Sequence, residues 1–202
     1  MLDALPCTEG QIRVRTLEYG DAALFARGSS DESVKRNGHL PLSDYTENVV
    51  REQIDGAIAD GLADGSLAVL AIADAGSDEF LGSIVLFNVR ADRAEVGFWL
   101  APWGRGRGAA RDALSAAARI AARQGLTFLE ARTAPDNQAS RRTLLSAGYR
   151  QVGEPQTVTA PSGAVFTALT FERSVAEPRF KRLAPIASAC SCFEDGPGGF
   201  AD

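Results

Sequence analysis

Cysteine and histidine are scarce in this 202-residue sequence, which has three cysteines and a single histidine. An odd number of cysteines, all near the chain ends, does not suit a disulfide framework. Cys190 and Cys192 are separated from His39 by most of the chain, which makes them a poor set of metal ligands. We therefore expect no metal cofactor and no disulfide scaffold.

Long apolar runs are also missing. No stretch of about 18 apolar residues could span a membrane, and residues 1–7 lack the basic start and apolar core of a secretory signal. The chain is acidic, with a net charge of −5, and does not interleave basic clusters with aromatic residues. Nucleic-acid binding is therefore not expected. These absences predict a cytoplasmic protein that binds neither membranes nor nucleic acid.

What is present is the composition of a globular protein, with 45% hydrophobic and 23% charged residues. The length suits one domain of ordinary size. Near residue 176 the periodic pattern stops, and the sequence becomes rich in Pro, Gly, Ser and Cys. We predict one domain over residues 1–175, followed by an irregular or disordered tail over residues 176–202.

Charge is unevenly distributed within the predicted domain. Residues 18–65 contain ten acids and four bases, whereas residues 101–150 contain three acids and nine arginines. The acidic half either attracts a cationic substrate or forms a solvated helix face, and the sequence leaves both interpretations open.

Hydrophobic periodicity predicts the element order β-α-α-β-β-β-α-β-α-β-β. Strands are expected at residues 12–17, 67–73, 80–89, 94–101 and 127–133, from residue 149, and at 165–171. Helices are expected at residues 21–26, 43–62, 108–124 and 134–147. The remaining segments, including residues 1–10, 28–41 and 155–163, are expected to be loose or to form loops. This order predicts an α+β fold in which helices pack on one mixed, mainly antiparallel sheet.

A glycine-rich turn joins the strand at 94–101 to the helix at 108–124. It contains three glycines at alternate positions and two arginines: Gly104, Arg105, Gly106, Arg107 and Gly108. Glycines let the backbone turn sharply and approach a ligand closely. The helix that follows begins with unpaired N–H groups and the positive end of its dipole. A strand, such a turn and a helix N-terminus together favour an anion site, and a pyrophosphate accepts several N–H groups at once.

Three other interpretations of this turn have to be considered. A Gly-rich turn with no ligand is the plainest alternative, because short motifs have real false-positive rates. A Walker phosphate loop ends in Gly-Lys-Ser/Thr, but this turn ends in Gly-Ala-Ala. A dinucleotide-binding turn needs G-x-G-x-x-G, and the three glycines do not have that spacing.

The pattern Arg105-x-x-Gly108-x-Ala110 resembles the Q/R-x-x-G-x-G/A signature of the GNAT superfamily of acyl-CoA N-acyltransferases. A second run, Asn137-x-x-Ser140 followed by a helix that ends at Gly148, resembles the N-x-x-S segment of the same family. It lies one strand after the glycine turn, as in that family. The resemblance covers about residues 11–172 and points to the RimJ/RimL-like branch, whose members acetylate protein N-termini, amino acids or small amines.

The resemblance implies the GNAT fold, acetyl-CoA as co-substrate and the following cofactor contacts. The backbone of Phe98, Trp99 and Leu100 would pair with the pantetheine arm like an added strand. The pyrophosphate would be held by backbone N–H groups of the turn and helix start, at Arg105, Gly106, Arg107, Gly108, Ala109 and Ala110. Asn137 would hydrogen-bond the pantetheine, and Ser140 would lie near the thioester sulfur. A plain helix cap is the alternative role for Asn137, and a plain helix-surface serine is the alternative for Ser140.

Catalytic residues follow less directly from the sequence. Many family members have a tyrosine four residues before the glycine that ends this helix, but Leu144 occupies that place here. Ser140 is then the candidate acid for the departing thiolate. Glu95 is the candidate general base, because a carboxylate in an otherwise apolar strand is unusual unless it has a specific role. Glu130 and water are the alternative bases, and an exposed Glu95 paired with Arg93 is the structural alternative.

The sequence therefore predicts an acetyl-CoA-dependent N-acetyltransferase that moves an acetyl group directly to a primary amine. The acceptor would be a protein N-terminus, an amino acid, or a small-molecule or antibiotic amine, and the protein would be a monomer or homodimer. Two alternatives belong to other classes. One is a GNAT-fold module that binds acyl-CoA without turnover, and the other is a nucleotide-binding protein that uses the same turn.

Overall fold

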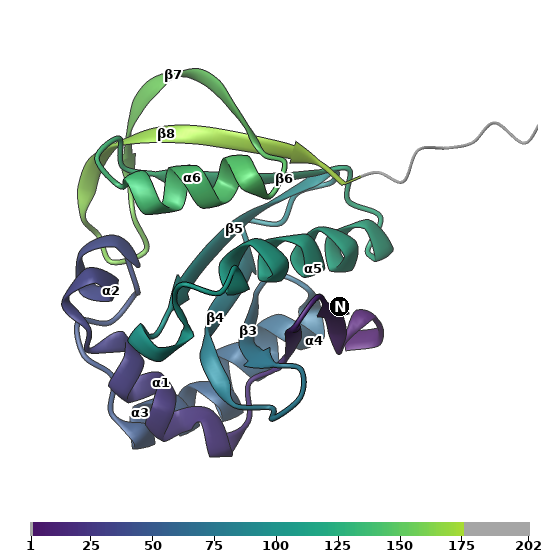
Figure 1. Cartoon of the computed structure of the whole chain (residues 1–202), viewed down its shortest axis with the longest axis vertical. Coiled ribbons are helices and arrows are strands. Elements are labelled where there is room, and N and C mark those ends of the chain that lie inside the picture. The colour runs from purple at the N-terminus through teal and green to yellow at the C-terminus, as the bar shows by residue number, and fades with distance from the viewer. Residues whose placement is uncertain (1, 176–202) are drawn as a thin grey trace, which may run out of the picture.

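Apolar and β-branched segments pair into one eight-stranded sheet within residues 2–175, which are the residues that the computed structural model describes (Figure 1). The strands are β1 Cys7–Glu9, β2 Ile12–Thr16, β3 Ala68–Asp74, β4 Phe80–Phe87, β5 Arg93–Leu100, β6 Phe128–Thr133, β7 Arg150–Thr159 and β8 Val165–Ser174. Their order in the sheet is β1-β2-β3-β4-β5-β6-β8-β7. Within the described residues β5 and β6 are parallel, and the other neighbours are antiparallel. The mixed, mainly antiparallel sheet expected from the sequence is thus confirmed.

Helices cover this sheet. They are η1 Leu2–Ala4, η2 Tyr19–Asp21, α1 Ala22–Ser29, α2 Glu32–Asn37, α3 Glu47–Gln53, the π-helical η3 Ile54–Ile58, α4 Ala59–Asp64, η4 Pro102–Gly104, α5 Ala109–Arg123 and α6 Gln138–Ser146. Helix α5 packs against β1, β2, β4 and β5 through a side made largely of alanine, which lets the helix lie close to the strands. Helix α6 packs beside α5 (Figure 1). Helix α1 packs on β4, and its Phe25 lies edge-on to Trp99 with ring centroids 5.1 Å apart.

Four local predictions are wrong. The segment expected to be loose at 1–10 contains ordered elements in its described part, because Cys7–Glu9 forms β1 on the edge of the sheet. The expected loop at 28–41 contains α2, which begins where the Asp31 carboxylate accepts hydrogen bonds from the N–H groups of Ser33 and Val34. The helix expected at 43–62 begins at Glu47, after the cap residue Thr46, and is interrupted by a π-helical turn.

The fourth error concerns the last hairpin. Strand β7 runs on to Thr159, so most of the loop expected at 155–163 is strand. Pro155 is accommodated because the β7–β8 register shifts between Val152 and Gln156, where a missing N–H costs no ladder hydrogen bond. The tail expected at 176–202, with Cys190 and Cys192, lies outside the described residues.

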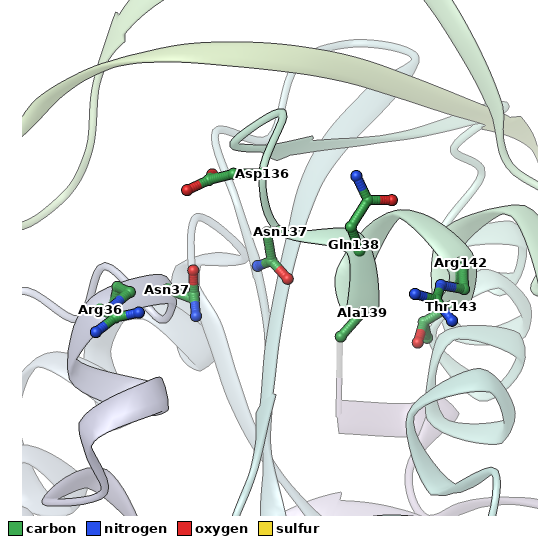
Figure 2. A pocket seen from close by; sticks show the side chains of 8 residues that line it. All are labelled: Arg36, Asn37, Asp136, Asn137, Gln138, Ala139, Arg142 and Thr143. Atoms are coloured by element: carbon green, nitrogen blue, oxygen red, sulfur yellow. The ribbon is translucent and has the colours of Figure 1, made fainter.

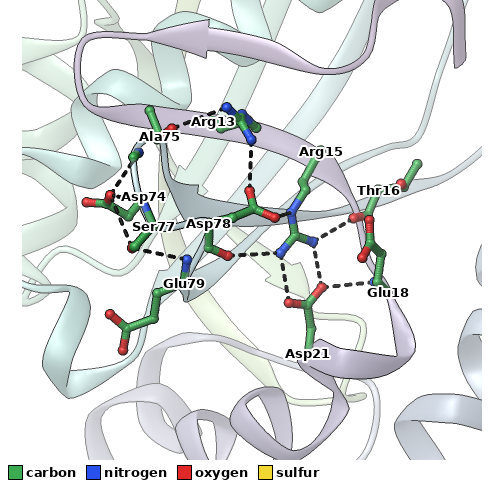
Figure 3. Close-up of polar contacts among 11 residues, drawn as sticks. Arg13, Arg15, Thr16, Glu18, Asp21, Asp74, Ala75, Ser77, Asp78 and Glu79 are labelled. Atoms are coloured by element: carbon green, nitrogen blue, oxygen red, sulfur yellow. Dashed lines mark hydrogen bonds and ion pairs between the residues drawn. The ribbon is translucent and has the colours of Figure 1, made fainter.

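Asp21 is the N-cap residue of α1. Its side chain makes no cap hydrogen bond to α1. It pairs instead with Arg15 of β2, whose Nη1 and Nη2 donate to the two Asp21 oxygens at 2.7 and 3.0 Å (Figure 3). Arg15 Nε also donates to Asp78 in the β3–β4 turn at 3.1 Å. One buried guanidinium therefore ties β2, the start of α1 and this turn together.

Among the helices of residues 2–175, none combines the length and the apolar character that crossing a membrane requires.

Candidate active site

The central parallel pair of strands opens partway along its length. Strands β5 and β6 are paired at three positions, Arg93↔Phe128, Ala94↔Leu129 and Glu95↔Glu130. Beyond these, β5 continues to Leu100 beside β4, and β6 continues to Thr133 beside β8. The backbone of residues 96–100 therefore has no strand partner on its β6 side. An extended ligand can hydrogen-bond to such an edge as an added strand.

The glycine turn stands at the end of this open strand edge. Gly106 and Gly108 have φ values of +82° and +77°, which side chains disfavour, so glycine is required to bend the chain from η4 into α5. Gly108 is the N-cap of α5 and has no side chain to cap it. Within residues 2–175 no backbone acceptor receives the N–H groups of residues 106–110. Unpaired donors beside the positive end of a helix dipole are chemically suited to an anion.

The two arginines of the turn are held by the protein itself. Arg105 donates from Nε and Nη2 to the Leu100 carbonyl oxygen at 3.2 and 3.0 Å, and from Nη2 to Asp31 Oδ1 at 2.7 Å. Arg107 Nη2 donates to the Trp103 carbonyl oxygen at 2.6 Å. The Arg105 guanidinium, helped by the hydrogen bonds at the start of α2, lowers the pKa of Asp31 to about 2. The arginines thus brace the turn, while the backbone N–H groups of residues 106–110 keep no backbone acceptor within residues 2–175.

Asn137 caps α6. Its Oδ1 accepts a hydrogen bond from the Ser140 N–H at 3.1 Å, as the capping alternative predicts. The cap uses only the oxygen of the side-chain amide. Within the described chain no acceptor is found for Asn137 Nδ2, so this donor remains available to a ligand, and Ser140 is half-buried one turn further along the helix.

A cleft of about 630 Å³ lies between α2 and α6 (Figure 2). Two of its lining residues come from α2 and the others from α6 and the loop before it: Arg36, Asn37, Asp136, Asn137, Gln138, Ala139, Arg142 and Thr143. The sequence reading missed the α2 side because it took that segment as a loop. The available signal was Asp31 three residues before the buried Val34, since an acid there caps a helix. The cleft joins Asn137 to residues from the other end of the chain.

Glu95 is buried on β5, at 8% exposure, and is not the exposed residue of the structural alternative. Its partner is Arg132 of β6 rather than Arg93. Arg132 Nε donates to Glu95 Oε1 at 2.9 Å, Nη2 donates to Oε2, and Asn88 Nδ2 donates to Oε2 at 3.0 Å. The hydrogen bond to Glu95 raises the pKa of Arg132. The pair bridges the two strands where they begin to diverge.

Glu130, the alternative base, belongs to a second cluster on the same strands. Arg93 Nη1 donates to Glu130 Oε1 at 2.7 Å and lies 3.5 Å from Glu172 Oε2 of β8. Hydrogen bonds to Asp92 and then to Glu130 raise the pKa of Arg93. Both candidate bases are therefore engaged with arginines.

The lone histidine lies in the connection between α2 and α3. The His39 ring stacks on Phe166 of β8, with centroids 4.4 Å apart, which joins the α2–α3 connection to the last hairpin. Burial lowers the pKa of His39. Within residues 2–175 no group of three or more His, Cys, Asp or Glu side chains is arranged to hold a metal ion.

The chain matches the family model described as an acetyltransferase (GNAT) domain over residues 11–150, so it belongs to the GNAT family. This confirms the resemblance seen in the sequence. Among curated proteins none matches significantly.

Solved structures of this family share the fold. RimJ of Mycobacterium smegmatis in complex with CoA-disulfide superimposes with a TM-score of 0.70 at 22% identity, covering 85% of this chain and 88% of that chain. RimL, a ribosomal L7/L12 alpha-N-protein acetyltransferase in complex with coenzyme A, gives 0.69 at 16% identity, with coverages of 83% and 96%. Spermidine N-acetyltransferase of Vibrio cholerae in complex with CoA and spermine gives 0.66 at 15% identity, with coverages of 81% and 95%. RimJ and RimL among these neighbours agree with the RimJ/RimL-like branch.

Proposed function

We propose that this protein is an acetyl-CoA-dependent N-acetyltransferase that moves the acetyl group directly to a primary amine. The observation that carries the proposal is the open edge of β5, which leads straight to the glycine turn and the start of α5. An extended arm ending in a pyrophosphate matches both parts at once. Family membership and neighbours solved with CoA support the same cofactor.

In this proposal the pantetheine arm pairs with the backbone of Phe98, Trp99 and Leu100. The pyrophosphate accepts hydrogen bonds from the backbone N–H groups of the turn and helix start, at Gly106, Arg107, Gly108, Ala109 and Ala110. The Arg105 N–H would join them after leaving the Pro102 carbonyl oxygen, to which it donates at 3.5 Å. Asn137 donates to the pantetheine from Nδ2, because its Oδ1 is occupied by the cap. Hydrogen bonds to a charged group contribute about 1.5–3 kcal/mol each, more than the roughly 0.3–1 kcal/mol of the helix dipole.

The acceptor amine must be neutral to attack the thioester. An α-amine with a pKa near 7.8 costs about 1 kcal/mol to deprotonate at pH 7, and a lysine amine about 4.6 kcal/mol. Glu95 is the proposed base. Because both of its oxygens are hydrogen-bonded, it takes the proton through a water molecule or after releasing Asn88. Glu130 and bulk water are the alternatives.

Ser140 is the proposed acid for the departing CoA thiolate, from the first turn of α6. The demand on this acid is small, because a thiol with a pKa of about 8.5 can also be reprotonated by solvent. Leu144, where many family members have tyrosine, is fully buried in the core.

One observation favours a second candidate, an acyl-CoA-binding module without turnover. Both oxygens of the Glu95 carboxylate already accept hydrogen bonds from Arg132 or Asn88, so neither oxygen is open to an incoming amine in this arrangement. The two functions are separated by mixing the protein with acetyl-CoA and a panel of amines, and following release of the CoA thiol. Release that depends on one amine supports the enzyme. Tight acetyl-CoA binding by calorimetry, with no release on any amine, supports the module.

A further inference from the structure

We infer that the cleft between α2 and α6 binds the acceptor, and that Arg36 pairs there with a carboxylate that the acceptor carries in addition to its amine. This assignment rests on the proposed function, since it names the acceptor class of that site. It starts from three polar groups of the cleft wall: the Arg36 guanidinium, the Asn37 amide and the Asp136 carboxylate.

Arg36 and Asp136 are the charged lining residues on the α2 side of Asn137 (Figure 2). Within residues 2–175 neither side chain makes a hydrogen bond or an ion pair. The neighbouring cation of α2, Lys35, is engaged with Asp44 at 3.1 Å. The helix thus uses one cation for its own structure and presents the other to the cleft.

Asn37 adds an acceptor atom on the same wall. Its Nδ2 donates to the Ser33 carbonyl oxygen at 3.0 Å within α2. The remaining oxygen, Oδ1, is then the part of the amide available to a ligand donor. Figure 2 places Asn37 on the α2 wall and Asn137 and Asp136 opposite it.

The α2 wall is fixed relative to the cofactor turn. Asp31, the N-cap of α2, holds the first turn of the helix and also accepts a hydrogen bond from Arg105 at 2.7 Å. Arg36 is therefore carried on a helix that is anchored to the turn. A charged group on such a support can select an acceptor by geometry, because less freedom is lost on binding.

The arrangement gives the cleft a direction. Asn137 lies between the two groups of lining residues (Figure 2), and its Nδ2 is the atom proposed to bind the pantetheine, so we place the reacting amine beside it on the α2 side, near Asp136, where an ammonium arrives favourably. The acceptor then extends toward Arg36. A polyamine would place a second positive charge against this guanidinium, whereas a carboxylate would form a charge-assisted hydrogen bond with it.

Arg142 also lines the cleft, but it lies beside α5, on the other side of Asn137 from α2 (Figure 2). That side faces α5, which packs against α6 and whose start is the proposed pyrophosphate site. Arg36 is therefore the cation assigned to the acceptor, and Arg142 is the residue whose replacement tests this choice.

The test uses acceptor pairs that differ only in charge: Ala-Glu-amide against Ala-Gln-amide, and Ala-Asp-amide against Ala-Asn-amide, with spermidine as a polycation. The amines of each pair titrate alike, so a difference in kcat/KM reports the carboxylate. We expect the acidic member of at least one pair to be preferred by about tenfold or more, from hydrogen bonds to a charged group. Arg36→Gln should remove the preference, and Arg36→Lys should restore part of it. Lys35→Gln should leave it unchanged.

The assignment is overturned if neither pair shows a preference, if spermidine is the better substrate, or if the preference survives in Arg36→Gln. Loss of the preference in Arg142→Gln instead of Arg36→Gln also overturns it. If acetyl-CoA binds but no acceptor releases CoA, the proposed enzyme is contradicted. In that case calorimetry in the presence of CoA measures how tightly each acceptor pair binds. The assignment of Arg36 then requires that the acidic member binds more tightly to the parent and that Arg36→Gln removes this difference.

Discussion

Arg132 reaches across from β6 to hold the carboxylate of Glu95 on β5 at the point where the two strands separate. The contact lies where the pairing of β5 and β6 stops, and its two residues are 37 positions apart in the chain. The ion pair is nearly buried on the Glu95 side, whose side chain is 10% exposed, but the Arg132 side chain is 29% exposed.

Replacing Arg132 by glutamine should destabilise the fold by about 2–3 kcal/mol, less than the roughly 3–5 kcal/mol of a fully buried pair, because one partner is partly hydrated. The physical cause is a buried carboxylate without its cation. Urea unfolding of Arg132→Gln measures the change. The double variant Glu95→Gln with Arg132→Gln should recover part of the loss, and failure to recover any would show that the charge is not the cause.

Glu95→Gln tests the proposed base. If Glu95 receives the amine proton, the variant should lose turnover mainly below pH 8, where a protonated α-amine is abundant, and approach the parent at higher pH. The measurement is the ratio of variant to parent kcat/KM from pH 6 to about 9.5. A ratio that does not change with pH assigns the proton to Glu130 or to water.

Substitutions at Gly108 test the proposed anion site. Gly108→Asp puts a carboxylate where the pyrophosphate is proposed to bind, and should weaken acetyl-CoA binding by at least about a hundredfold, since several charge-assisted hydrogen bonds are opposed. Gly108→Asn is the matched control, because both residues tolerate the φ of +77° and have the same shape. Calorimetry should find Asp at least about tenfold weaker than Asn. Equal affinities would place the pyrophosphate elsewhere.

The buried ion pair between Arg15 and Asp21 should stabilise the fold independently of the candidate active site. Arg15→Met should cost about 3–5 kcal/mol, because it leaves the buried Asp21 carboxylate without its bidentate partner. Arg13→Met is the control, since its pair with Asp78 is exposed and should contribute less than about 1 kcal/mol. Chemical denaturation of the two variants gives both values. Similar losses would show that packing of the arginine stems is what matters.

Because of the ion pair between Arg105 and Asp31, the stability of the fold should depend on pH. The pKa of Asp31 is lowered from 3.8 to about 2, chiefly by Arg105, so its stabilising effect is present above pH 3.8 and is lost as the pH falls through about 2. Asp31→Asn keeps a good helix cap but removes the charge. The parent should therefore have a higher Tm than Asp31→Asn at pH 7, and the difference should shrink between pH 3.8 and 2. A constant difference in Tm would exclude the ion pair as its source.

Most of the sheet and the central helix were predictable, because their residues repeat with the period of the element they form. Strands β2 to β6 and α5 lie within a few residues of their predicted places. Two of the errors fell where a feature other than hydrophobic periodicity decides the structure. Helix α2 depends on the Asp31 cap, and the break at Gly56 depends on a backbone conformation with φ −106° and ψ −109° that hydrophobic periodicity does not encode.

The features of the candidate site likewise fall into those set by local sequence and those set by tertiary contacts. The sequence by itself determined the glycine turn before α5 and the Asn137 cap of α6, since both depend on backbone conformation within a few residues. Only the tertiary structure decided that Glu95 pairs with Arg132, that β5 and β6 separate beyond Glu95, and that α2 supplies Arg36 to the cleft. These contacts join segments far apart in the chain, and their energies depend on the distance and burial that the whole fold imposes on each charge.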